Sequence, residues 1–217
     1  MMLAVTFGAS AQITFGVKAG ANFSSVSNYA AGTIVDWGTL VKSETNPSMK
    51  VGFNAGVFAE YKLSSLLGVH VEALYSLQGV NTKNTTTSIL GNGEAIENLS
   101  TAYVNVPVLA KAHFGKLAVY AGPQFSFVAS MATKYITGSD DSKKEQTDKI
   151  KAENYNTFDL SVAVGASYML TRNIGIDARY NLGVTNVFAA KKDSDGNVTK
   201  EAYGKNGSIQ AGVFYAF

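Results

Sequence analysis

The sequence has no cysteine, only 3 proline residues and no long uninterrupted apolar run. Without cysteine the chain has neither a disulfide framework nor a thiolate metal site. A transmembrane helix needs a run of about 18 apolar residues, so the absence of such a run excludes one. The formal net charge is only +2, so the charge balance does not indicate nucleic acid as a partner.

Glycine and aromatic residues are frequent instead, with 21 Gly, 11 Tyr and 12 Phe among 217 residues. Together with scarce proline, this composition is typical of a chain built from many strands. A short apolar run, Met1–Phe7, precedes Ala9-Ser10-Ala11, which matches a signal-peptide cleavage site without the positively charged start. We expect residues 1–11 to be the remnant of a signal peptide, rather than an apolar first strand. Residues 12–217 show no linker or composition break, and we expect one domain there.

Strict alternation of apolar residues marks the stretch from Phe158 to Val184. The apolar positions are Phe158, Leu160, Val162, Val164, Ala166, Tyr168, Leu170, Ile174, Ile176, Ala178, Tyr180, Leu182 and Val184. A period of two residues predicts two long strands, joined by a tight turn at Thr171-Arg172-Asn173. Strands in soluble sheets usually have about 5–6 residues, whereas a tilted membrane-spanning strand needs roughly 9–11. The length therefore favours a membrane-spanning sheet.

The same alternation predicts eight strands along the chain. Their approximate bounds are 13–24, 49–63, 69–78, 102–114, 117–131, 158–170, 174–184 and 207–217. The connections alternate in length, with long ones at about 25–48, 81–100, 134–154 and 188–206. Bacterial single-chain barrels have an even strand number, short periplasmic turns and longer outer loops. We predict an all-β fold: an eight-stranded antiparallel up-and-down transmembrane β-barrel in the bacterial outer membrane, with four long extracellular loops and both termini periplasmic.

The positions of the aromatic residues support this reading, because barrels carry an aromatic belt at each membrane interface. Those expected near the periplasmic interface are Phe15, Tyr61, Phe114, Tyr168, Tyr215 and Phe217. Those expected toward the outer interface are Phe23, Phe53, Phe125, Phe127 and Phe158. Tyr75 and Tyr180 lie nearer the middle of their strands and fit less well.

Periodicity alone does not say which face is inside, and a lipocalin-like soluble barrel would turn the apolar face inward. Large apolar side chains on all eight strands, and repeated glycine on the opposite face, favour a polar lumen in which the glycines leave room for long charged side chains. An eight-stranded lumen is only wide enough to be filled by side chains. The predicted lumen residues are Lys18, Lys50, Glu60, Lys62, His70, Glu72, Lys111, His113, Asp159, Asp177 and Arg179. Buried charges persist only when paired, so we predict a self-paired polar plug and not an open channel.

Two pairs of these residues have an alternative interpretation. His70 and His113, with Glu60 or Glu72 nearby, could bind a metal ion, and Glu60 with Glu72 could act as a catalytic carboxylate pair. Hydrogen-bonded and ion-paired roles within the plug are favoured for both pairs. The predicted outer loops contain no histidine, which argues against histidine-dependent catalysis there. We therefore expect no catalytic, cofactor or metal site.

The order of several short segments resembles the PorT-like outer-membrane β-barrel family of Bacteroidetes-type bacteria. The matching segments are Phe15-Gly16-Val17-Lys18-Ala19-Gly20-Ala21-Asn22-Phe23-Ser24, Gly52-Phe53-Asn54-Ala55-Gly56, Glu72-Ala73-Leu74-Tyr75-Ser76-Leu77-Gln78-Gly79, Tyr103-Val104-Asn105-Val106-Pro107, Ala121-Gly122-Pro123-Gln124-Phe125 and Asp177-Ala178-Arg179-Tyr180-Asn181-Leu182-Gly183. The resemblance implies an outer-membrane barrel, and the terminal Phe217 fits the signal read by barrel-insertion machinery. The secretion role of the family's namesake does not transfer residue by residue.

Four classes of function remain open from the sequence. The favoured one is a non-enzymatic structural or interaction protein that displays its outer loops to an unknown protein or surface ligand. The alternatives are a narrow small-solute channel and a component associated with protein secretion, with an outer-membrane enzyme less favoured. The expected surroundings are outer-membrane lipid and lipopolysaccharide. The charged segment Lys143–Lys151 is either a solvated loop or a contact for lipopolysaccharide phosphates or a partner.

Overall fold

The computed structural model describes residues 13–27, 32–36, 41–88, 91–137, 144–150, 155–188, 191–192, 198–200 and 204–217. The strands in these ranges are β1 (Ile13–Val26), β2 (Gly32–Asp36), β3 (Val41–Lys62), β4 (Leu67–Ser88), β5 (Gly91–Phe114), β6 (Leu117–Thr137), β7 (Lys144–Lys149), β8 (Phe158–Met169), β9 (Ile174–Gly183), β10 (Lys191–Lys192), β11 (Val198–Lys200) and β12 (Asn206–Ala216). The expected signal-peptide remnant, residues 1–11, lies outside the described residues.

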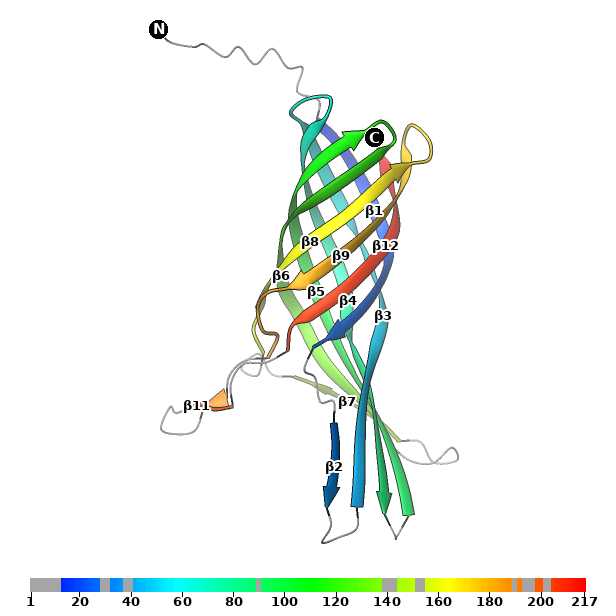
Figure 1. Cartoon of the computed structure of the whole chain (residues 1–217), viewed down its shortest axis with the longest axis vertical. Coiled ribbons are helices and arrows are strands. Elements are labelled where there is room, and N and C mark those ends of the chain that lie inside the picture. The colour runs from blue at the N-terminus through cyan, green and yellow to red at the C-terminus, as the bar shows by residue number, and fades with distance from the viewer. Residues whose placement is uncertain are drawn as a thin grey trace.

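Within the described part of the chain, eight strands close into a ring in the order β1-β12-β9-β8-β6-β5-β4-β3 (Figure 1). Every pairing in the ring is antiparallel, and β1 closes it by pairing with both β12 and β3. Each ring strand otherwise pairs with its neighbours along the chain, which is up-and-down topology. The predicted eight-stranded barrel is confirmed.

Short turns connect the ring strands at one end, which we call the turn end. They are residues 63–66, 115–116 and 170–173, and they match the predicted short connections. Gly115 has a φ of 66°, a conformation that a residue without Cβ adopts without strain. In the other two turns the hydroxyls of Ser64 and Thr171 accept backbone hydrogen bonds from residues two and three positions later.

The opposite end, which we call the hairpin end, differs from the prediction. Much of the segments 25–48 and 81–100, predicted as loops, is strand: β3 begins at Val41, and β4 and β5 pair up to Ser88 and Gly91. These strands project beyond the ring, with β2 added to the edge of β3 (Figure 1). These segments are rich in polar Thr and Asn residues and lack an apolar alternation, so the sequence did not predict them as strands. Their β-branched threonines nevertheless favour the extended ladder.

The third and fourth predicted loops also contain strand. β6 continues to Thr137 and pairs with β7, so a large part of the segment 134–154 is a β-ladder. The segment 188–206 contains the short pair β10–β11. Within the described residues, no helix is long and apolar enough to cross a membrane.

The apolar face of the ring points outward. Along β9 the residues alternate strictly between exposed and buried, and the exposed ones are the apolar set that includes Ile176 and Leu182. Exposed apolar patches on soluble monomers rarely exceed a few hundred Å², whereas here all eight ring strands expose large apolar side chains. Hydrocarbon is the solvent that suits this surface, so the lipocalin-like alternative is excluded.

Aromatic residues gather on this outer face toward the two ends. All six of the turn-end set are exposed, from 42% for Tyr61 to 74% for Phe217. Tyr215 and Phe217 contact each other with ring centroids 5.5 Å apart. Toward the hairpin end, Phe158 packs against Phe127 at 5.5 Å. The two belts lie where a membrane barrel meets lipid headgroups.

Candidate functional site: the filled lumen and its turn-end pocket

Three layers of side chains fill the lumen, and their order can be followed along β4. From the turn end, its buried residues are first charged or ionisable (His70, Glu72), then, after Leu74, polar (Ser76, Gln78), and then apolar (Val80). We call the layers the charged cluster, the polar girdle and the apolar plug. The charged cluster comprises Lys18, Glu60, His70, Glu72, Lys111, Tyr120, Asp177 and Arg179.

Glu72 is the centre of one half of the charged cluster. Its Oε1 accepts a hydrogen bond from Arg179 Nη2 at 2.5 Å and lies 3.4 Å from Lys18 Nζ. Lys18 Nζ also donates to Asp177, as does the hydroxyl of Tyr120. The guanidinium carbon of Arg179 lies 5.3 Å from the centroid of the Tyr120 ring. These five residues come from β1, β4, β6 and β9, so the cluster joins opposite walls of the barrel.

Glu60 is the centre of the other half. Its Oε2 accepts a hydrogen bond from Lys111 Nζ at 2.9 Å and lies 3.1 Å from His70 Nδ1. His70 Nε2 lies 3.0 Å from Glu72 Oε1, so this ring bridges the two halves. Three basic side chains (Lys18, Lys111 and Arg179) therefore meet three carboxylates (Glu60, Glu72 and Asp177) around this ring.

Aromatic rings complete this layer, and they lie over glycines of neighbouring strands. A Cβ added at Gly16 would lie 2.2 Å from the ring of Phe58, and one at Gly175 would lie 2.2 Å from the ring of Phe214. Phe58 stacks on His70 at 4.9 Å and meets Phe214 edge to face at 5.9 Å. These two glycines leave room for the aromatic rings of Phe58 and Phe214.

The polar girdle takes one uncharged polar side chain from each ring strand. Its members are Asn22, Asn54, Ser76, Asn105, Gln124, Ser161, Asn181 and Gln210. Asn22 Nδ2 donates to Ser76 Oγ at 2.7 Å, and Asn54 Nδ2 donates to Asn22 Oδ1 at 2.5 Å. Both amide atoms of Asn105 and of Gln210 have no partner within the described part of the chain. Buried amides of this kind normally bind water.

The apolar plug lies at the hairpin end of the lumen and was not predicted. It consists of Val26, Val80, Leu99, Met131, Val187 and Phe188. Val80 and Leu99 are 0% and 1% exposed. The sequence does carry a signal: the inward phase of β4 passes from Ser76 and Gln78 to Val80, so an apolar residue follows polar ones on the lumen face.

Four of the predicted lumen residues lie outside the charged cluster: His113, which lines the pocket described below, and Lys50, Asp159 and Lys62. Lys50 Nζ donates to the carbonyl of Leu99 at 3.1 Å and to the hydroxyl of Ser100. Asp159 is buried and accepts a hydrogen bond from Thr185 Oγ1 at 2.5 Å. Lys62 is the last residue of β3, where the lumen opens, and it is exposed. These three residues lie toward the ends of the lumen, away from the ion pairs of the charged cluster.

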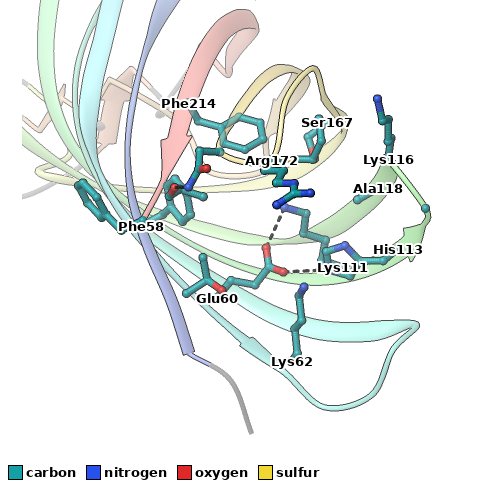
Figure 2. Close-up of a pocket in the computed structure, with 16 residues that line it drawn as sticks. Phe58, Glu60, Lys62, Lys111, His113, Lys116, Ala118, Ser167, Arg172 and Phe214 are labelled. Atoms are coloured by element: carbon teal, nitrogen blue, oxygen red, sulfur yellow. Dashed lines mark hydrogen bonds and ion pairs between the residues drawn. The ribbon is translucent and has the colours of Figure 1, made fainter. Parts of the chain in front are cut away.

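A pocket of about 260 Å³ opens at the turn end, beside the charged cluster (Figure 2). Its basic lining residues are Lys62, Lys111, His113, Lys116 and Arg172, and the acidic side chain is Glu60. His113 Nε2 lies 2.9 Å from Glu60 Oε1, at an angle that does not make a hydrogen bond. Phe58 and Phe214 also line the pocket. Sequence reasoning missed Lys116 and Arg172, because both occupy turns that were read only as connections.

The family described as "Outer membrane protein beta-barrel domain" matches residues 9–189. The chain belongs to this family. It is an integral β-barrel of the outer membrane, embedded in lipid.

Solved outer-membrane barrels are similar in fold to this barrel. Neisserial surface protein A has 16% identity, a TM-score of 0.45, and coverage of 96% of this chain and 100% of its own. The attachment invasion locus protein Ail of Yersinia pestis has 14% identity and a TM-score of 0.39, covering 94% and 97%. The outer membrane protease OmpT of Escherichia coli has 11% identity and a TM-score of 0.47, covering 99% of each chain. No curated protein sequence matches the barrel.

The residues considered for metal binding are ion-paired instead. His70, Glu60 and Glu72 contact one another and the cations of the cluster. Across the described ranges, no group of three or more His, Cys, Asp or Glu residues is arranged to hold a metal ion.

Proposed function

We propose that this outer-membrane barrel is a closed membrane anchor, and that the β-structure projecting from its hairpin end carries its interactions. One observation carries the proposal: side chains occupy three successive levels of the lumen. Within the charged cluster, the void bounded by Lys18, Glu72 and Asp177 is about 10 Å³. One water molecule needs about 10–15 Å³. A hydrated solute therefore has no room to pass without rearranging the cluster.

The energetics support a permanent plug. Opening a path through the charged cluster separates buried partners such as Arg179 and Glu72. Breaking a buried ion pair by removing one partner costs about 3–5 kcal/mol, because the other charge stays buried without compensation. A rearrangement that exposes several such charges at once would be costlier still.

The projecting strands support the interaction role. β2, β3, β4 and β5 form one antiparallel ladder beyond the ring, and β7 extends β6 on another side (Figure 1). Paired strands hold their side chains in fixed positions, so binding costs less ordering entropy than it would for free loops. The partner we propose is a protein or surface ligand outside the cell, with lipopolysaccharide around the barrel and no nucleic acid.

Single-channel recording in planar bilayers tests the closed lumen. The wild-type barrel should show no steady openings, and Lys205→Met, which removes an exposed charge near the hairpin end, should behave in the same way. Steady openings in the wild type, altered by Arg179→Met or Glu72→Gln, would contradict the closed anchor. They would favour the second candidate, a narrow channel. The unpartnered amides of Asn105 and Gln210 are the observation in its favour, because they could line a hydrated path.

The finer assignments belong to the same proposal. The PorT-like segments support membership of that narrower group, and an association with protein secretion would follow from it. The terminal Phe217 supports recognition by barrel-insertion machinery. Its backbone N–H already donates to the carbonyl of Phe15 at 2.9 Å, which completes the last pairing of the ring. Short turns support a periplasmic turn end, and with it periplasmic termini.

A further inference from the structure

We propose that the turn-end pocket is a binding site for a phosphate-bearing anion. This inference concerns the opposite end of the barrel from the proposed interaction surface, and it holds whether or not the lumen conducts. It starts from the charge of the pocket. Lys62, Lys116 and Arg172 are all exposed at its mouth, and none of them forms an ion pair with a carboxylate within the described residues.

The acidic side chain in the lining does not neutralise these cations. Glu60 Oε2 accepts a hydrogen bond from Lys111 at 2.9 Å and contacts His70 at 3.1 Å. Glu60 Oε1 lies 2.9 Å from His113 Nε2. Oε2 is therefore engaged by the deeper Lys111 and His70, and Oε1 faces His113, so neither oxygen pairs with the cations at the mouth, which keeps an excess of positive charge.

The fold explains why these cations meet. Lys62 ends β3, Lys116 lies in the turn between β5 and β6, and Arg172 lies in the turn between β8 and β9. Short turns at one end of a closed barrel bring these three positions around a single opening. Figure 2 shows Arg172 and Lys62 on different sides of Glu60 and Lys111, and Lys116 at the rim with its ammonium pointing outward. The cations thus approach one space from different strands, and do not form a stripe on one strand.

The number and kind of donors favour phosphate. A phosphate group presents three or more acceptor oxygens pointing in different directions, so cations on several sides of a pocket can each contact one. Arginine supplies a planar fork of donors and lysine a compact point charge, and both are used in phosphate sites. The pocket, at about 260 Å³, lies just below the usual range of about 300–1,000 Å³ for ligand sites. This size suits a small anion or a headgroup.

The same chemistry has two sources: a free phosphate compound, or the phosphodiester of a phospholipid from the adjacent leaflet. Phe58, Met169 and Phe214 give the pocket an apolar side, which suits the organic part of an ester. The test therefore uses two probes. Inorganic pyrophosphate is titrated into the full chain in nanodiscs of zwitterionic phosphatidylcholine, and the retention of phosphatidylglycerol through detergent exchange is measured by native mass spectrometry.

The variant pair is K116Q/R172Q, with K149Q/K205Q as control. Each removes two exposed positive charges, but the control positions lie at the hairpin end. Wild type and control should bind one of the two probes with affinities within about twofold of each other. K116Q/R172Q should bind at least tenfold more weakly, and the wild-type affinity should fall steeply with salt. Both double variants should keep the heat-modifiable migration of the folded barrel in gel electrophoresis.

The outcomes separate the sources and the alternatives. Saturable pyrophosphate binding with no retained lipid assigns a free phosphate ligand, and the reverse assigns a phospholipid headgroup. Equal loss of binding in both double variants would mean that only net charge matters, and would overturn the site. Failure of both probes to bind the wild type would overturn it as well. Neither result bears on the closed lumen, which the conductance measurement decides.

Discussion

Gly16 shows how one missing side chain shapes the barrel wall. Its Cα lies under the ring of Phe58, and a Cβ there would come within 2.2 Å of that ring. Phe58 in turn stacks on His70, the residue that bridges the two halves of the charged cluster. A glycine on one strand therefore controls the position of an ionisable group two strands away.

The substitution Gly16→Ala should lower the free energy of unfolding. Overpacking a filled interior costs about 1–3 kcal/mol, and Phe58 has Phe214 on its other side. Gly207→Ala is the control, because a Cβ there would meet nothing closer than 3.8 Å. Urea unfolding in detergent micelles, followed by circular dichroism, measures both. Equal stability of the two variants would show that both Phe58 and the backbone carbonyl of Tyr215, which a Cβ at residue 16 would approach within 2.3 Å, move aside freely.

The substitution Arg179→Met should be more damaging than Arg172→Met. Arg179 is buried and bonded to Glu72 at 2.5 Å, so its loss leaves a buried carboxylate undercompensated, at a cost of about 3–5 kcal/mol. Arg172 is exposed in a turn, where substitutions usually change stability by less than about 0.5 kcal/mol. The same urea experiment compares them. Restoring neutrality with Arg179→Met/Glu72→Met should recover part of the loss, and no recovery would mean that the ion pair is not the cause.

For single residues, the sequence predicted which side of the barrel wall a side chain occupies, but not how far along the barrel axis it lies. Period two places Lys18, Glu72 and Asp177 on the lumen side, and the structure finds all three buried there. The same period also places Lys50 and Lys62 on that side. It cannot say that Lys62 lies where the lumen opens, because position along the barrel axis depends on strand register and tilt. The sequence could not predict the ion-pair partners for the same reason. Arg179 and Glu72, for example, are 107 residues apart in the chain.

At the scale of elements, the hairpin of β4 and β5 combines two functions. Near the ring it supplies Val80 and Leu99, which are paired across the two strands and buried in the apolar plug. Farther out, from Asn81 to Asn98, it continues as a polar ladder beyond the barrel. The inner part closes the lumen, and the outer part is available for contacts.

Shortening the hairpin should separate these functions. Deleting residues 85–94, which leaves Asn84 and Ala95 to be joined by a two-residue Asn-Gly turn, removes only the projecting ladder. This variant should insert and keep its heat-modifiable migration, and it should lose any binding to a surface partner. Deleting residues 80–99 removes the Val80–Leu99 pair as well and should also lower the unfolding temperature. Equal stability of the two deletions would show that the plug does not stabilise the barrel.

The segment from Asn81 to Ser100 shows why element boundaries were the weaker part of the prediction. Its Thr, Asn and Gly residues lack apolar alternation, so it was read as a loop. Apolar alternation along a strand reports an apolar face opposite a polar one, and this mostly polar segment has no apolar face in its sequence. The ring strands were predicted because one face contacts lipid and the other faces the lumen, so apolar and polar residues alternate along them. The projecting strands were missed because their sequence has no such alternation.

At the scale of the whole molecule, the barrel is asymmetric along its axis. Its two ends differ: one has short turns around a cationic pocket, and the other has projecting strands over an apolar plug. Short turns are periplasmic in bacterial single-chain barrels, and the long connections face outward. We therefore expect the hairpin end to face the outside of the cell.

The lack of native cysteine makes this orientation directly measurable. Thr147→Cys places one thiol on β7 beyond the ring, and Ser65→Cys places one in the turn between β3 and β4; both positions are exposed. A membrane-impermeant maleimide added to intact cells should label Thr147→Cys and not Ser65→Cys, while lysed cells should show both labelled. Labelling of Ser65→Cys alone in intact cells would reverse the orientation. The cationic pocket would then face the medium, and the phosphate groups available to it would be those of lipopolysaccharide and not of the inner leaflet.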